Sequence, residues 1–163
     1  MTIADQGLAA ASPEARLARL GLALPPPPAP VANFVTHVRE GSLLFLSGQG
    51  PIEADGRQHT GKVGGAVTVQ DAYQHARLTG MNLIAVMRAA LGDLGRVKRI
   101  VKVFGMVNAA PDFSEHPQVI NGCSDLFIAV FGDAGRHARS AVGHVSLPGD
   151  ITVEIEAVVA VRD

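Results

Sequence analysis

The residues best suited to chemistry gather near the C-terminal end, in the segment HARSAVGHVSLPGDITVEIEAVV (137–159). Arg139 stands between alanine and serine in an apolar strand pattern, where a guanidinium without an anion is costly. Glu154 and Glu156 follow in the next apolar run. An arginine fork can bind a substrate carboxylate while a glutamate nearby orients water or moves a proton. The alternative is a purely structural ion pair between Arg139 and Glu156.

The two runs are predicted to form a hairpin, and its register decides between these interpretations. Its turn is Leu147–Asp150, which has strong turn chemistry. With even symmetry, Arg139 shares one face with both glutamates, whereas an odd loop reverses that sharing. The expected opposite pairs are Gly143 with Glu154, Ala141 with Glu156, and Arg139 with Val158.

Other reactive residue types give weaker signals. The histidines at 37, 59, 75, 116, 137 and 144 include no pair at the i, i+4 spacing of helical metal ligands, so no metal site is expected. Cys123 is alone, which favours a small buried hydrophobe over a nucleophile and leaves no partner for an internal disulfide. The Ser47–Gly50 segment lacks the glycine two places before the serine that a nucleophile elbow requires.

Composition describes one ordinary domain and excludes several classes of protein. The chain has 163 residues, of which 47% are hydrophobic and 18% are charged, so it is not disordered. The formal charge of −1 disfavours binding to nucleic acid. No apolar run reaches the ~18 residues of a membrane span, and the first residues lack the basic region of a signal peptide. We therefore expect a cytoplasmic protein with no membrane or nucleic-acid partner.

The elements that must position the chemistry follow an N-terminal extension over residues 1–30 and a domain over 31–163. Ser12 and Pro13 predict a short helix, and a stiff proline-rich spacer follows it. Helical spacing after the capping residue Thr68 predicts a long helix that ends at Gly92 or Gly95. The other predictions are strands over 34–39, 43–48, 97–107, 138–146 and 151–161, a loop over 50–66, and a helix over 115–131.

This β-β-α-β-α-β-β order predicts an α+β fold with helices on one face of a mixed sheet. The other face must meet water or a partner. FVTHV (34–38) and ITVEIEAVVAV (151–161) are too apolar to face water, which favours oligomerisation.

The same segments resemble the Rid/YjgF family of reactive intermediate deaminases, once labelled L-PSP endoribonucleases. The resemblance covers roughly residues 31–162. It rests on ARSAV (138–142), Leu147-Pro148, VEIEA (153–157), GSLLFLSGQ (41–49) and Asp112-Phe113 followed by Asn121. It implies a chorismate-mutase-like fold and a homotrimer whose sheets form a central barrel, with three inter-subunit clefts and neither cofactor nor metal.

The resemblance also implies roles for individual residues. Arg139 would bind the carboxylate of an enamine or imine derived from an amino acid, and Glu154 would position the attacking water. The remaining cleft residues implied by the family are Phe34, Ser47, Gly48, Asn121 and Ala141.

The sequence departs from the family pattern at several points. Phe34 stands where many deaminases have tyrosine, Ala141 where they have cysteine, and His137 where the strand signature has proline. The segment from Phe113 to Asn121 is about a helical turn longer than in the best-known members. Three functions remain open: an imine deaminase, a non-catalytic trimer that binds small carboxylates, and an RNA-cleaving protein, which the charge disfavours.

Overall fold

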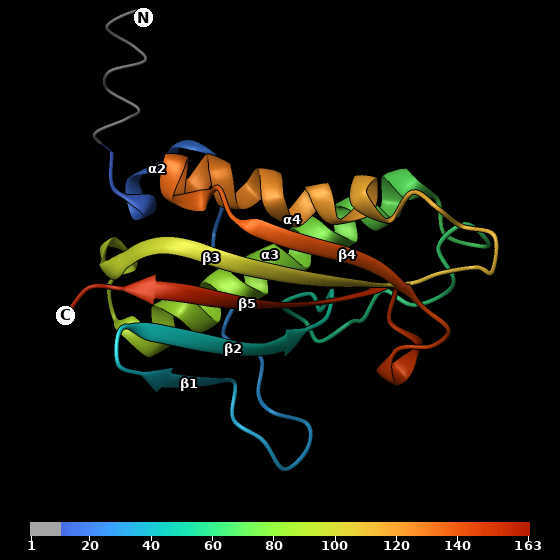
Figure 1. Cartoon of the computed structure of the whole chain (residues 1–163), viewed down its shortest axis with the longest axis horizontal. Coiled ribbons are helices and arrows are strands. Elements are labelled where there is room, and N and C mark those ends of the chain that lie inside the picture. Colours follow the sequence, from blue (N-terminus) through green and yellow to red (C-terminus); the bar gives the residue numbers. More distant parts are fainter. Residues whose placement is uncertain (1–10) are drawn as a thin grey trace, which may run out of the picture.

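A five-stranded mixed sheet with helices on one face forms the body of the computed structural model, which describes residues 11–163 (Figure 1). The expected α+β class and element order are confirmed. The first ten residues of the predicted N-terminal extension lie outside the described part. The elements are α2 (Pro13–Arg19), β1 (His37–Glu40), β2 (Leu43–Gln49), α3 (Val69–Leu91), η1 (Leu94–Arg96), β3 (Val97–Asn108), α4 (His116–Phe131), η2 (Gly132–Gly135), β4 (Ala138–His144), η3 (Pro148–Asp150) and β5 (Val153–Val161).

The strand order is β1-β2-β5-β3-β4. The hairpin of β1 and β2 is confirmed, with Gly41 at a φ of 57° in its turn. The predicted hairpin of the last two strands is wrong. β4 pairs in parallel with β3, and β5 pairs antiparallel with both β2 and β3, so β3 separates β4 from β5.

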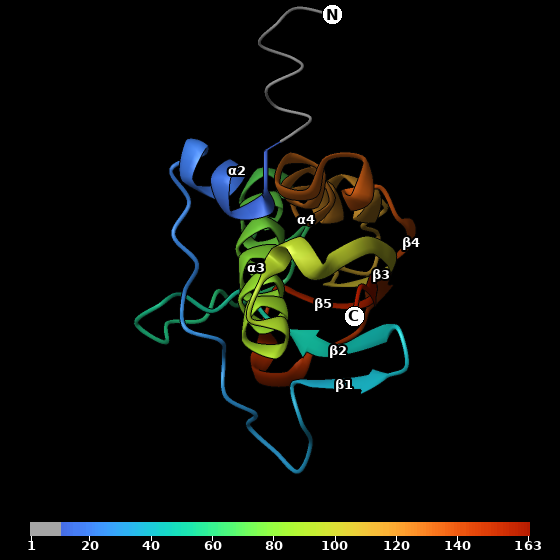
Figure 2. The same ribbon diagram turned by 90° about the vertical axis from the view of Figure 1, so that its left-hand side faces the viewer.

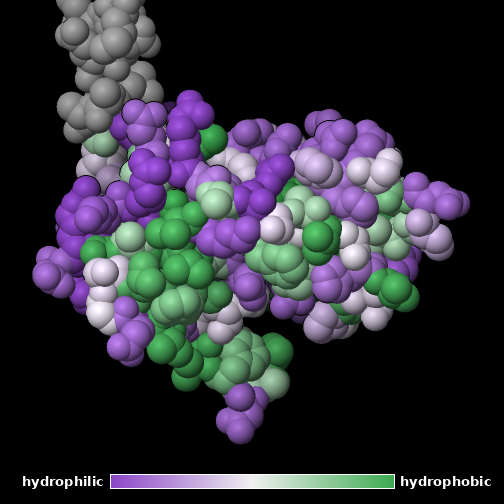
Figure 3. Space-filling model, viewed as in Figure 1, coloured by the Kyte–Doolittle hydropathy of each residue, from purple (hydrophilic) through white to green (hydrophobic). Residues whose placement is uncertain are grey.

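The hydrophobic core lies between the sheet and the helices α3 and α4, which cover one face together (Figure 2). Alternation along β5 places Val153, Ile155 and Ala157 in this core and leaves Glu154 and Glu156 on the other face, which we call the open face. The space-filling view of the open face shows a large hydrophobic area over the sheet (Figure 3). It includes Val38 and Phe45, which are 54% and 43% exposed.

Capping residues fix where the helices begin. Thr68 Oγ1 accepts from the backbone N–H of Asp71, and Ser12 Oγ accepts from that of Ala15, as their sequence positions predict. The short helix α2 is attached to the body, because Leu17 is buried and Glu14 accepts a hydrogen bond from the backbone of Leu94 at 2.7 Å. Contacts with α4 and η1 therefore hold α2 against the body.

Helices α3 and α4 cross closely at Gly122. We therefore expect Gly122→Ala to lower the stability of the fold strongly. A Cβ at Gly122 would collide with the backbone oxygen of Tyr73 and would lie 3.0 Å from the Arg77 nitrogen. Because backbone cannot move aside cheaply, the free energy of unfolding should fall by about 3 kcal/mol or more. Urea unfolding at fixed protein concentration measures it. The control is Gly80→Ala, whose Cβ would meet the flexible end of Leu126 at 3.0 Å and should cost less.

Candidate functional site

Arg139 lies on the edge strand β4 and points to the helical side of the sheet. Its register partner on β3 is the buried Val103, which fixes the face. The Nη1 group donates to Asn121 Oδ1 and to Ser124 Oγ, both at 2.9 Å. Nη2 makes one long bond of 3.4 Å to the Pro117 carbonyl. Both hydrogens of Nη1 are therefore engaged, while Nε and one hydrogen of Nη2 have no acceptor among the described residues.

Behind Arg139, a chain of hydrogen bonds continues to His137. Ser124 Oγ lies 3.0 Å from His137 Nε2, and His137 Nδ1 lies 2.6 Å from the Gly135 carbonyl. Since a carbonyl only accepts, Nδ1 carries the proton and Nε2 accepts from the Ser124 hydroxyl. Burial and the charge of Arg139 lower the pKa of His137, against the Gly135 hydrogen bond, which raises it. A neutral His137 thus holds the hydroxyl that anchors Arg139.

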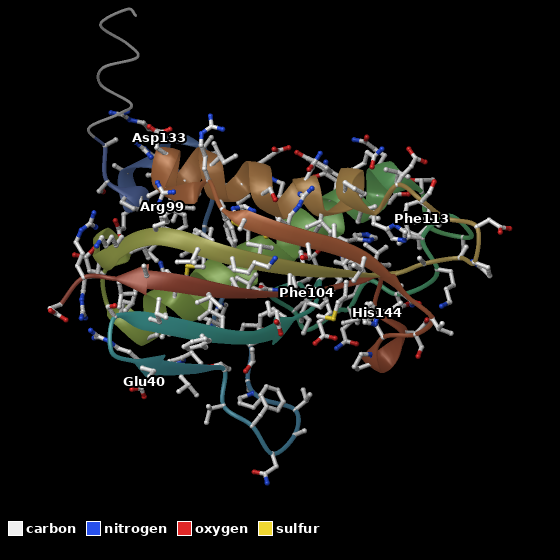
Figure 4. All side chains as sticks on the ribbon, in the orientation of Figure 1. Glu40, Arg99, Phe104, Phe113, Asp133 and His144 are labelled. Atoms are coloured by element: carbon white, nitrogen blue, oxygen red, sulfur yellow. The ribbon has the colours of Figure 1, made fainter. Side chains whose placement is uncertain are left out.

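Glu154 lies on the open face, half-buried, in a different environment. Its β3 partner is Met106, which also faces outward. Burial raises the pKa of Glu154, and the neighbouring negative charge of Glu156 raises it further, while His144 lowers it. A Cβ at Gly48 would collide with the Glu154 carboxylate, so a side chain at this position on β2 would displace that carboxylate. Figure 4 labels His144 near the end of β4 on this side of the sheet.

A pocket of about 490 Å³ surrounds the Glu154 carboxylate. Phe34 and Gly48 line it with Glu154, so the structure brings together three of the residues implied by the resemblance. Ser47 stands behind the wall, because its hydroxyl donates to the Val35 carbonyl at 2.6 Å and ties the preceding segment to β2. The lining residues are Pro28, Ala29, Pro30, Val31, Ala32, Phe34, Thr36, Gly48, Gln49, Gly50, Ile52, Gln58, Pro148, Gly149, Ile151 and Glu154.

Within one chain, Arg139 and Glu154 do not form one site. The expectation that they share a face fails because β4 and β5 both pair with β3, and that strand turns Val103 inward and Met106 outward. The alternative pair of Arg139 with Glu156 fails for the same reason. Asn121 lies with Arg139, whereas the side chain of Ala141 packs against the core and offers only its backbone at the sheet edge. The described chain therefore carries two half-sites on opposite faces.

The remaining reactive groups do not extend either half-site. Cys123 is fully buried, and burial raises the pKa of its thiol, as the interpretation of a core residue predicts. Residues 11–163 hold no group of three or more histidine, cysteine or acidic side chains that could bind a metal. No helix in the same range is long and apolar enough to cross a membrane.

Sequence reasoning missed two features of the site. The first is the support of Arg139 by Ser124 and His137. The role of Ser124 could have been found from its spacing to Asn121, since residues three apart share one helix face. The wall that residues 28–32 form beside Glu154 carries no such signal, because an extended proline-rich segment gives no direction in the sequence.

Comparison with known proteins identifies the family. A family model described as "YjgF/chorismate_mutase-like, putative endoribonuclease" matches residues 14–153. The chain belongs to the YjgF family. Within it, "Protein TCP17" of Trypanosoma cruzi is 45% identical over 150 residues, covering 91% of this chain and 94% of that protein. The crystal structure of Atu1372, a protein with unknown function from Agrobacterium tumefaciens, is 42% identical, with a TM-score of 0.85 over 99% of this chain and 100% of that one.

A relative of this YjgF-family protein is named for its enzymatic activity. The 2-iminobutanoate/2-iminopropanoate deaminase of Salmonella typhimurium is 33% identical over 135 residues, which cover 83% of this chain and 91% of that enzyme. The fold and the family are thereby established for this chain.

Two half-buried histidines of this YjgF-family protein predict a loss of stability in mild acid. Burial lowers the pKa of His137, and burial together with the stacked ring of His59, 4.2 Å away, lowers that of His75. The unfolded chain, whose histidines titrate near the ordinary value of 6.5, then binds more protons than the folded chain. The free energy of unfolding should therefore be greatest above pH 6.5 and fall as the pH drops below it.

Denaturant midpoints at about pH 7.5 and about pH 5 would measure this effect. His75→Gln and His137→Gln should each show a smaller loss between the two pH values than the parent protein. A variant that loses as much stability between the two pH values as the parent protein would show that the replaced histidine does not contribute to the pH dependence.

Proposed function

We propose that the protein is an imine deaminase that works as a homotrimer. Its substrate would be a 2-imino acid or enamine derived from an amino acid, bound in a cleft between subunits and hydrolysed to a 2-oxo acid and ammonia. The proposal needs a second subunit because Arg139 and Glu154 lie on opposite faces of one sheet.

The exposed surfaces of one chain support such an assembly. The open face presents large apolar side chains to solvent, including Phe45 at 43% and Val142 at 36% exposure. β4 pairs with β3 only, so alternate backbone groups of its outer edge are free to meet a neighbour. If the open faces close a barrel, the β4 edge of one subunit can approach the Glu154 pocket of the next. The two half-sites then line one cleft.

Arg139 would bind the substrate carboxylate. Its Nε and Nη2 groups lie on the same edge of the planar guanidinium and form the fork that matches a carboxylate. The Nη1 bonds to Asn121 and Ser124 hold that fork in one orientation before the substrate arrives. Such preorganisation lowers the entropy lost on binding.

Glu154 would act as the general base. Its raised pKa makes the carboxylate more basic than an exposed glutamate. It takes a proton from water as the water oxygen bonds to the imine carbon, and the electrons of the C=N bond move to nitrogen. Glu154 passes this proton to the nitrogen, which gives a carbinolamine. Glu154 then takes the proton of the carbinol hydroxyl and delivers it to the nitrogen, so that the C–N bond breaks and ammonia leaves as the C=O bond forms. One water and one imine yield one 2-oxo acid and one ammonia.

The observation that carries the proposal is that the chain holds both a preorganised arginine fork and a half-buried, basic glutamate, which a second subunit could bring together. The 33% identity to a 2-iminobutanoate/2-iminopropanoate deaminase agrees with it. The formal charge of −1 gives no comparable support for an RNA-cleaving function.

A semicarbazide competition assay tests the proposal. An amino-acid oxidase generates the imine, semicarbazide traps it, and an active deaminase suppresses the semicarbazone signal. We expect suppression by the wild-type protein and a solution mass of three chains. A monomeric mass would remove the inter-subunit cleft, and an unchanged semicarbazone signal for every imine would reject catalysis.

The second candidate is a non-catalytic trimer that binds small carboxylates in the same cleft. Phe34 favours it, because a phenyl ring offers no hydroxyl to water or nitrogen beside Glu154. Binding of a 2-oxo acid without turnover of any imine would support this candidate over the deaminase.

A further inference from the structure

The pocket around Glu154 has a wall that the sheet does not provide. Residues 28–32, which we call the strap, line the pocket with Phe34, Ile52 and Ile151. Figure 1 shows this stretch of the chain extending beyond the body below β1. The wall is almost entirely aliphatic or aromatic, so it presents an apolar surface to whatever Glu154 meets.

No cation lines this pocket. Glu154 is its single ionisable lining residue, and the other polar side chains there are Thr36, Gln49 and Gln58. A second carboxylate on a substrate would lie beside a glutamate with no opposite charge in the lining. The pocket therefore discriminates against acidic side chains by repulsion as well as by the lack of a partner.

The volume also exceeds what a small side chain needs. At about 490 Å³ the pocket lies within the range of roughly 300–1,000 Å³ that holds whole small ligands. A methyl group would leave the strap and Phe34 in contact with water. A branched or aromatic side chain would displace that water and bury apolar surface on both partners.

Two prolines restrict the strap before any ligand binds. Pro28 and Pro30 have fixed φ angles, so the strap loses less conformational entropy on binding than a segment without proline would. Beyond it, the Phe34 N–H donates to the Ala32 carbonyl at 2.9 Å, and the Ser47 N–H donates to the Thr36 carbonyl at 3.0 Å. A preformed wall of this kind selects ligands by shape.

We infer that the pocket selects imines with a large apolar side chain, branched or aromatic, over small or acidic ones. The inference rests on the proposed function, since it takes Glu154 and Arg139 as the groups that meet the reacting end. It assigns the strap and Phe34 to side-chain specificity.

Side-chain selectivity is measured with imines made from leucine, phenylalanine, alanine and glutamate in the competition assay. We expect kcat/KM for the leucine and phenylalanine imines to exceed that for the alanine imine by at least about tenfold, the scale at which apolar pockets discriminate. The glutamate imine should be the poorest. Equal or faster turnover of the alanine imine would overturn the inference and leave the deaminase function intact.

Two variants connect selectivity to the wall. Phe34→Ala should lower kcat/KM for the leucine imine more than for the alanine imine. Val31→Lys, at a position that is 89% exposed, places a cation on the rim and should raise the relative rate of the glutamate imine. The matched control is Val35→Ala, an exposed neighbour outside the lining, which should leave the ratios unchanged. Unchanged ratios in both wall variants would reject the role of the strap.

A binding measurement covers the case in which no imine is hydrolysed. Calorimetry with 4-methyl-2-oxopentanoate and pyruvate compares a branched and a methyl side chain on the same carboxylate-bearing head. Tighter binding of the branched acid, lost in Phe34→Ala, would uphold the selectivity while the deaminase function fails. Equal affinity would overturn the selectivity as well.

Discussion

Arg139→Ala is expected to lower kcat/KM for imine hydrolysis by about 100-fold or more, because the substrate carboxylate loses a charge-assisted fork. Arg139→Lys should recover little of the loss, since an ammonium keeps the charge without the two parallel donors. Steady-state competition assays on both variants measure the effect, with the circular dichroism melting curve as a check on folding.

The control for Arg139 is Arg136, which lies nearby but is exposed and pairs with Asp133 at 3.5 Å. Arg136→Ala should keep full activity and nearly full stability, because an exposed pair contributes little. Comparable losses in the Arg136 and Arg139 variants would indicate a general effect of positive charge and would exclude a specific carboxylate fork.

Glu154→Gln is the second variant with a large expected effect. Removing a general base lowers kcat by about 10²–10⁴-fold, while KM should change little because Arg139 still holds the carboxylate. Wild-type activity should rise with pH as Glu154 loses its proton, with a midpoint above the ordinary value of 4.5 because burial and Glu156 raise its pKa. In Glu154→Gln that acid limb should disappear from the pH profile of kcat.

Glu156→Gln is a control that should shift the acid limb of the pH profile without abolishing it. Its negative charge on the open face raises the pKa of Glu154, so Glu156→Gln should lower that pKa and shift the acid limb to lower pH. The maximal kcat at higher pH should stay close to that of wild type. An unmoved limb in Glu156→Gln would mean that another group controls the pH profile.

Local features of the fold could be predicted from the sequence because their causes are local. The Thr68 cap and the apolar spacing that follows it define α3, which begins at Val69 as expected. The pairing of the last two strands was mispredicted because turn chemistry shows only that the chain bends. Gly149 and Asp150 do adopt positive φ angles of 62° and 56° in the predicted turn. After this turn, however, the chain passes to the other side of β3, where β5 pairs with β3 and not with β4. The partner of a strand depends on residues far away in the sequence.

The same distinction applies to the site. Family motifs identify Arg139, Asn121 and Glu154 as candidate site residues but do not show where they lie in space. In the structure, the first two lie together and the third lies on the other face of the sheet. The support of Ser124 by His137 arises from packing between α4 and the residue before β4, which no short motif encodes.

The central position of β5 has a consequence for how the chain is made. β5 follows every other strand in the sequence, yet it lies between β2 and β3 and joins them. Until it emerges from the ribosome, the nascent chain carries two separate strand pairs with unpaired apolar edges, which invite association with other chains. The sheet can therefore close only after β5 has been made, and a truncation before Val153 would leave two separate strand pairs with exposed edges.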